Sequence, residues 1–89
     1  MSRRSILPII HALEEGVRDD IILHLIDDFV ENYGTSPGDV TVVWKGEPTT
    51  LLNKAAQLGE RRIVEELLAL GSDPSTIRNP ADNVLDLIQ

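Results

Sequence analysis

Residues 50–74 constrain the fold of this chain more than any other segment. They read TLLNKAAQLGERRIVEELLALGSDP, and two short runs with helical apolar spacing are joined there at Gly59. The second run ends at Gly71, and a turn signal follows it. A helix–turn–helix unit of this size cannot bury its apolar face alone. The segment therefore predicts stacked neighbours and an extended binding surface rather than a pocket.

The same segment resembles one repeat of the ankyrin family, which has the pattern TPLHxAAxxGHxxIVxxLLxxGADP. Leu51 and Val84 lie 33 residues apart, which is the ankyrin period. Residues 7–16 have the same length as residues 50–59, and they place Pro8 at the family's proline position. The resemblance is therefore strongest in the centre of the chain and extends toward both ends.

The resemblance implies an all-α fold that forms a single domain over residues 1–89. The fold would be a short ankyrin-like solenoid of about two and a half helix–turn–helix repeats. It would carry a hairpin-like insertion near residues 35–48. Repeat 1 would span about residues 5–48, repeat 2 about residues 49–81, and a partial repeat 3 about residues 82–89.

The chain departs from the family at a histidine that normally hydrogen-bonds neighbouring hairpins. Ile10, Asn53 and Asp86 occupy this position here, so the resemblance implies weaker connections between repeats. The last expected helix, residues 83–88, has too many apolar side chains for one side of a six-residue helix. It predicts self-association through the C-terminal helix or a partner that covers it.

The first half of the chain contains one long amphipathic helix and one short strand. Apolar residues recur at helical spacing across residues 18–33, and Gly34 is expected to end this helix. Residues 40–44 are β-branched or aromatic and lie between two turn signals. They predict a short strand or one arm of a hairpin.

The net charge of −7 is concentrated in one segment. Residues 14–39 hold eight acidic side chains and one basic side chain, and the charges of the other residues cancel. Bare nucleic acid and anionic membranes are unlikely partners because such a field repels both. A protein partner with a basic surface is favoured.

The residue types argue against catalysis and against metal or cofactor binding. The chain has no cysteine, no Gly-x-Ser-x-Gly motif and no glycine-rich phosphate loop. Asp19, Asp20 and His24 form the weak alternative of a small enzyme or metal site. A solvated helix face is the more common meaning of such residues, because rigid helices rarely bring enough oxygen atoms to one ion. We therefore expect a protein that is not an enzyme and needs no cofactor or metal.

The residues predicted to contact a partner lie on the insertion, at the ends of the inner helices and on the acidic helix. They are Trp44, Asp39, Lys45, Glu47, Glu14, Glu15, Gln57, Leu58, Asp20, Asp27 and Glu31. Three alternatives stay open. Trp44 is either an exposed contact residue or a cover for the core, and Leu58 is either a contact or core. The acidic residues either dock a partner or form a solvated face.

The function predicted from these features is a non-catalytic protein–protein interaction module that binds through hairpin tips and the inner-helix surface. The alternative is a small acidic inhibitor, of the immunity or anti-defence type, that blocks a basic enzyme by electrostatically steered binding. The location is expected to be cytoplasmic, because the apolar run after residues 1–4 is short and meets Glu14 and Glu15 where a signal peptide needs small residues.

Overall fold

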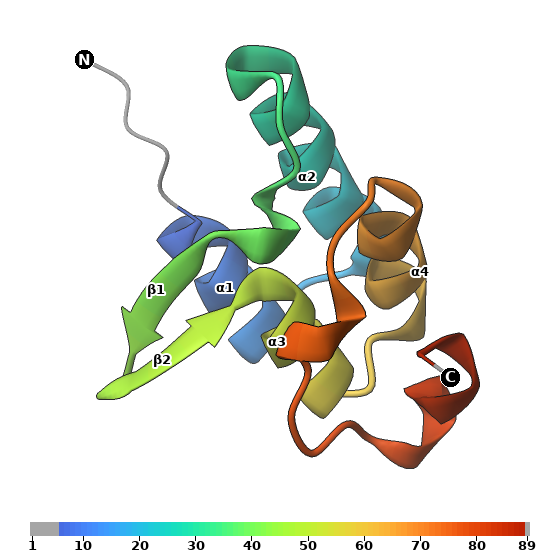
Figure 1. The fold of residues 1–89 in the computed structure, drawn as a ribbon. Coiled ribbons are helices and arrows are strands. Elements are labelled where there is room, and N and C mark those ends of the chain that lie inside the picture. The colour runs from blue at the N-terminus through green and yellow to red at the C-terminus, as the bar shows by residue number, and fades with distance from the viewer. Residues whose placement is uncertain (1–5, 89) are drawn as a thin grey trace.

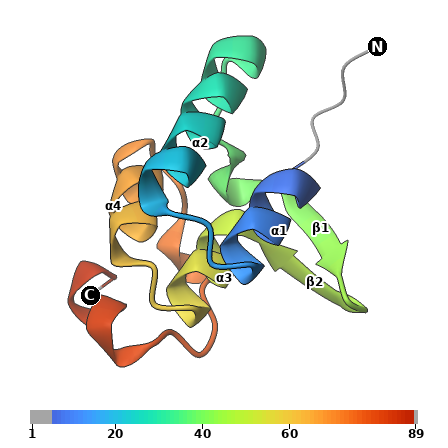
Figure 2. The same cartoon turned by 180° about the vertical axis from the view of Figure 1, so that it is seen from behind.

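The structure is a computed structural model that describes residues 6–88. Two helix pairs form its body: α1 (Leu7–Glu14) with α2 (Asp19–Tyr33), and α3 (Leu51–Gln57) with α4 (Arg61–Ala69). Helix α1 packs beside α3, and α2 packs beside α4 (Figure 1). The same arrangement is seen from behind in Figure 2. Residues 1–5, which include the charged start of the segment weighed as a signal peptide, and residue 89 lie outside the described residues.

The helices end where local sequence signals predict. Gly34 follows α2 with a left-handed φ of 70°, and its N–H donates to the Val30 carbonyl at 2.8 Å. Glycine takes this conformation without the steric penalty of a side chain, so the helix stops here. At the start of α3, the Thr50 hydroxyl accepts a hydrogen bond from the Asn53 N–H at 3.0 Å. This N-cap satisfies one of the free amides in the first turn.

The predicted all-α fold class is wrong, because the chain also forms a two-stranded antiparallel sheet. Strand β1 (Thr41–Trp44) pairs with β2 (Glu47–Thr50), after a 3-10 turn, η1 (Pro37–Asp39). Lys45 and Gly46 connect the strands with φ values of 52° and 85°, as a type I′ turn requires. The expected insertion is thus a true hairpin, which makes the fold mixed α and β. The hairpin projects beside α1 and α3 (Figures 1 and 2).

One hydrophobic core runs between the helix pairs. From α2 it takes Ile22, Ile26 and Phe29, while the outer members of the predicted stripe are half-buried. The other buried apolar residues come from α1, α3, α4 and the C-terminal segment. They are Ile6, Ile9, Ile10, Leu13, Leu51, Leu52, Ala55, Ala56, Ile63, Val64, Leu67 and Val84. The helical spacing read from the sequence therefore identified the faces that pack together.

The turns that follow α2 and α4 lie against each other. Ser36 Oγ and Ser72 Oγ are 3.2 Å apart, and an Asp39 carboxylate oxygen accepts a hydrogen bond from the Asp73 N–H at 2.9 Å. A Cβ added at Gly38 would lie 2.0 Å from Ser72 Oγ. Only glycine lets the two turns approach this closely. Asp39, a predicted contact residue, is exposed and uses one carboxylate oxygen to hold the neighbouring turn.

The C-terminal segment lies against α3 and α4 through two 3-10 helices, η2 (Pro74–Thr76) and η3 (Asp82–Leu87), rather than through the expected α-helix. The Ala81 N–H donates to the Ala56 carbonyl at 2.9 Å. Arg61 binds Asp86 through two contacts of 2.7 and 2.8 Å. Val84 is fully buried, whereas Leu85 is 39% exposed. The C-terminal segment therefore exposes less apolar surface than the sequence suggested. Self-association through this segment stays a prediction.

Within residues 6–88, no helix has both the length and the apolar character needed to cross a membrane.

Candidate functional site

A pocket of about 280 Å³ lies where the hairpin, α3 and the loop after η2 meet. The sequence predicted an extended surface rather than a pocket, so this hollow among the described residues was not expected. Its lining combines one aromatic ring with polar and charged side chains. The lining residues are Trp44, Glu47, Pro48, Thr49, Asn53, Lys54, Gln57, Arg78 and Asn79. We call the surface formed by these residues the pocket face.

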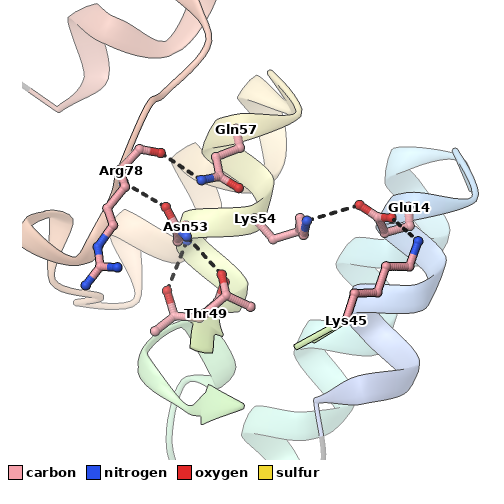
Figure 3. A network of polar contacts seen from close by, with 8 residues as sticks. Glu14, Lys45, Thr49, Asn53, Lys54, Gln57 and Arg78 are labelled. Atoms are coloured by element: carbon pink, nitrogen blue, oxygen red, sulfur yellow. Dashed lines mark hydrogen bonds and ion pairs between the residues drawn. The ribbon is translucent and has the colours of Figure 1, made fainter. Parts of the chain in front are cut away.

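Asn53 fixes two walls of the pocket (Figure 3). Its side chain is buried, with the residue only 6% exposed. Its Oδ1 accepts a hydrogen bond from the Arg78 N–H at 2.7 Å, and its Nδ2 donates to the Thr49 hydroxyl at 2.9 Å. Gln57 Nε2 donates to the Arg78 carbonyl at 2.9 Å. The backbone of Arg78 is therefore held on both sides from α3.

These contacts correct one expectation from the sequence. Asn53 stands where the ankyrin pattern has its histidine, and weaker connections were expected from the change. Instead, the asparagine amide connects β2 with the loop at Arg78, which lies 25 residues further along the chain. An amide side chain both donates and accepts, so it can satisfy a hydroxyl on one side and a backbone N–H on the other.

Glu14 joins α1 to the pocket face through two lysines (Figure 3). Its carboxylate lies 3.2 Å from Lys54 Nζ and 3.3 Å from Lys45 Nζ, and its side chain is 20% exposed. Hydrogen bonds from Lys54 and then Lys45 hold the pKa of Glu14 below its ordinary value. Glu14 and Lys45, both predicted contact residues, are thus partly occupied within the fold.

Trp44 combines the two roles that the sequence left open, an exposed contact residue and a cover for the core. It is half-buried, and its ring is 6.2 Å from the His11 ring at an angle of 59°. Lys45 Nζ is 5.8 Å from the centre of the indole. The indole Nε1 is buried and makes no hydrogen bond within residues 6–88. Trp44 therefore covers part of the core while it also lines the pocket.

The other predicted contact residues are distributed over several surfaces. Glu47 and Gln57 are exposed and line the pocket. Leu58 follows α3 and is 43% exposed, which favours the contact alternative over core. Glu15 is exposed at the end of α1 and does not line the pocket. The pocket face therefore brings together only part of the predicted set.

None of the acidic residues of α2 lines the pocket, and the helix itself lies away from the tip of the hairpin (Figures 1 and 2). Asp20 pairs with Arg18 at 2.7 Å, and this contact lowers the pKa of Asp20. Asp27 and Glu31 are exposed and make no ion pair within the described residues. In the same part of the chain, no group of three or more His, Cys, Asp or Glu side chains is arranged to hold a metal ion. The absence of a bound metal stays a prediction.

Glu60, at the start of α4, carries an unfavourable charge that can be tested. Burial and then the neighbouring Asp19 carboxylate raise the pKa of Glu60 above its ordinary value of 4.5. Unfolded Glu60 ionises near that ordinary value, so ionisation lowers stability as pH rises from 4.5 through the raised pKa. We expect Glu60→Gln to raise Tm at neutral pH and to change it little below pH 4.5, by thermal denaturation at both pH values.

The control for this change is Glu15→Gln, which removes one exposed carboxylate elsewhere and is expected to give no comparable gain. A Tm of Glu60→Gln at or below that of the unchanged protein at neutral pH would contradict the assignment.

Several lining residues were missed from the sequence. They are Pro48, Thr49, Asn53, Lys54, Arg78 and Asn79. Asn79-Pro80 is a turn dipeptide, and Asn79 has a positive φ of 52°. That dipeptide was the available signal that a second loop tip lies beside the hairpin. The pairing of Asn53 with Arg78 had no local signal.

No protein-family model, curated protein or solved structure matches this chain. The resemblance of residues 50–74 to an ankyrin repeat stays a prediction, and the functional argument depends on the residues of this chain alone.

Proposed function

We propose that this protein is a non-catalytic interaction module and that a partner protein binds on its pocket face. The supporting observation is a hollow whose walls are held by hydrogen bonds from Asn53 and Gln57, while the Glu47 and Arg78 side chains in its lining make no ion pair within residues 6–88. Asn53 and Gln57 hold the loop at Arg78, so little conformational entropy is lost there on binding. Trp44 and Arg78 are residue types that dominate the energetics of protein interfaces.

The charge of the chain supports a partner with a basic surface. The net charge is −7, and Asp27 and Glu31 remain unpaired on α2 among the described residues. Such a field speeds the approach of a cationic protein, and salt screens this effect. We include a cytoplasmic location in the proposal on the sequence argument alone.

The alternative function is an acidic inhibitor that blocks a basic enzyme. The exposed carboxylates on α2 favour it, because none of them lines the pocket and they give the chain a second surface for contact. In that case the partner would bind mainly to α2 rather than to the pocket face. The two functions therefore differ in which surface carries the affinity.

Two Glu→Arg substitutions, one on each surface, distinguish these two functions. Glu47 lines the pocket and Glu31 lies on α2; both are exposed and neither makes an ion pair within residues 6–88. We expect the immobilised protein to capture a partner from lysate, and Glu47→Arg to weaken the capture about tenfold or more. Glu31→Arg should weaken it only modestly and mostly at low salt. Loss with Glu31→Arg alone would support the inhibitor, and capture unaffected by either change would contradict both surfaces.

A further inference from the structure

Arg78 is the one lysine or arginine of residues 6–88 whose side chain makes no ion pair. The chain has 15 acidic and 8 basic side chains, so carboxylates are in excess. The other described basic residues each lie within 4.0 Å of a carboxylate. They are Arg18, Lys45, Lys54, Arg61 and Arg62. The unpaired guanidinium is thus an exception within an acidic protein, and it lines the pocket.

The backbone of Arg78 is fixed although its side chain is free. Asn53 accepts from its N–H at 2.7 Å, and Gln57 donates to its carbonyl at 2.9 Å (Figure 3). Both contacts come from side chains of α3, so the loop presents the guanidinium from a fixed position. Binding a ligand therefore costs the freedom of the Arg78 side chain but little freedom of the loop backbone.

A second lining residue of the pocket, Trp44, has a donor that also lacks a partner. The Trp44 indole Nε1 is buried and makes no hydrogen bond within residues 6–88. A buried donor without an acceptor is unfavourable, so an acceptor supplied from outside would stabilise it. Arg78 and Trp44 thus line the same pocket, one with a free guanidinium and the other with a buried indole N–H that lacks an acceptor.

The charge balance of the pocket selects the class of ligand. Lys45 and Lys54 are both used by the Glu14 carboxylate, which leaves Arg78 as the free cation. Glu47 lines the pocket and repels a group with two negative charges about twice as strongly as a group with one. A carboxylate has one charge and two oxygens that fit the arginine fork, whereas a phosphate dianion would meet too little positive charge.

We infer that the pocket binds a single carboxylate, from an aspartate or glutamate side chain of the partner protein, through the Arg78 guanidinium. This inference depends on the proposed function and specifies one contact in it. The partner is basic as a whole and carries this acidic residue on the segment that enters the pocket. The net negative charge of this chain then speeds the approach of the partner, while Arg78 binds the partner segment that carries the acidic residue.

The test uses the full chain labelled with ¹⁵N and the indole N–H signal of Trp44, which is the single tryptophan. The probes are acetyl-Gly-Glu-Gly-amide and its matched control, acetyl-Gly-Gln-Gly-amide. We expect a saturable shift with the glutamate peptide, with a Kd on the order of millimolar, and none with the glutamine peptide. Arg78→Gln should weaken the glutamate response at least about tenfold, and Arg62→Gln on α4 should leave it unchanged.

Three results would overturn the inference. The first is an equal response to both peptides or to neither, up to their solubility limits. The second is an unchanged response in Arg78→Gln, whose loop stays held because Asn53 and Gln57 contact only its backbone. The third is binding of inorganic phosphate as tight as that of the glutamate peptide, which would indicate a site for small anions in general. If Glu47→Arg weakens partner capture in any of these cases, the proposed function survives without this contact.

Discussion

Replacing Asn53 by alanine is expected to lower the free energy of unfolding by about 1–3 kcal/mol, because it leaves two partly buried groups without their hydrogen-bond partner. The Arg78 N–H loses its acceptor at 2.7 Å, and the Thr49 hydroxyl loses its donor at 2.9 Å. In a domain of this size, each kcal/mol corresponds to a fall in Tm of about 4–8 °C. Chemical denaturation measures the first quantity and calorimetry the second.

The same change should also loosen the pocket. We expect the Arg78 amide to exchange its hydrogen faster in Asn53→Ala, because its bond to Asn53 is the contact that protects it. Gln57→Ala is the control, since it removes one exposed contact to the Arg78 carbonyl and should cost less than about 1 kcal/mol. An Asn53→Ala protein as stable as Gln57→Ala would show that the loop is not held from α3.

Replacing Gly38 by alanine is expected to destabilise the protein by about 1–3 kcal/mol, because the added methyl group overlaps the neighbouring turn. Its Cβ would lie 2.0 Å from Ser72 Oγ and 2.9 Å from Ser72 Cβ. Ser72 is only 4% exposed, so it has little room to move away. The turns after α2 and α4 would then have to separate. Thermal denaturation of the single variant measures the loss.

A second change provides the control for this prediction. Ser72→Gly removes both clashing atoms, and the next contact of the new methyl group, Ser36 Oγ, lies at 3.3 Å. We expect the double variant Gly38→Ala with Ser72→Gly to be more stable than the sum of the two single effects predicts. Additive losses in this cycle would mean that the turns do not meet at Gly38.

The parts of the fold that depend on short-range patterns could be predicted from the sequence. Gly34 ends α2 as expected, and the β-branched residues before Trp44 form β1. Each of these features follows from side-chain sterics or from apolar spacing within about one turn or strand. The all-α class failed because the sheet needed residues 47–50 as a second strand, and only residues 40–44 had a clear strand pattern.

The candidate site was less predictable, because its geometry depends on contacts between distant segments. Asn53 meets Arg78 across 25 residues, and Glu14 meets Lys45 across 31. Nothing in the local composition of residues 76–80 indicates that α3 holds that loop. The sequence did identify Trp44, Glu47 and Gln57, since they lie on or beside the predicted hairpin and inner helix. Arg78 was missed because a single arginine in a loop gives no sequence pattern, and its role depends on residues that are distant in the sequence.

The most direct test of the pocket face is site-specific photo-crosslinking to the captured partner. A photoreactive amino acid is placed at Glu47 in one sample and at Glu31 in another, since both positions are exposed and free of ion pairs in the described part of the chain. We expect the partner to be crosslinked efficiently from position 47 and weakly or not at all from position 31. Efficient crosslinking from position 31 with none from position 47 would contradict the proposal and place the partner on α2.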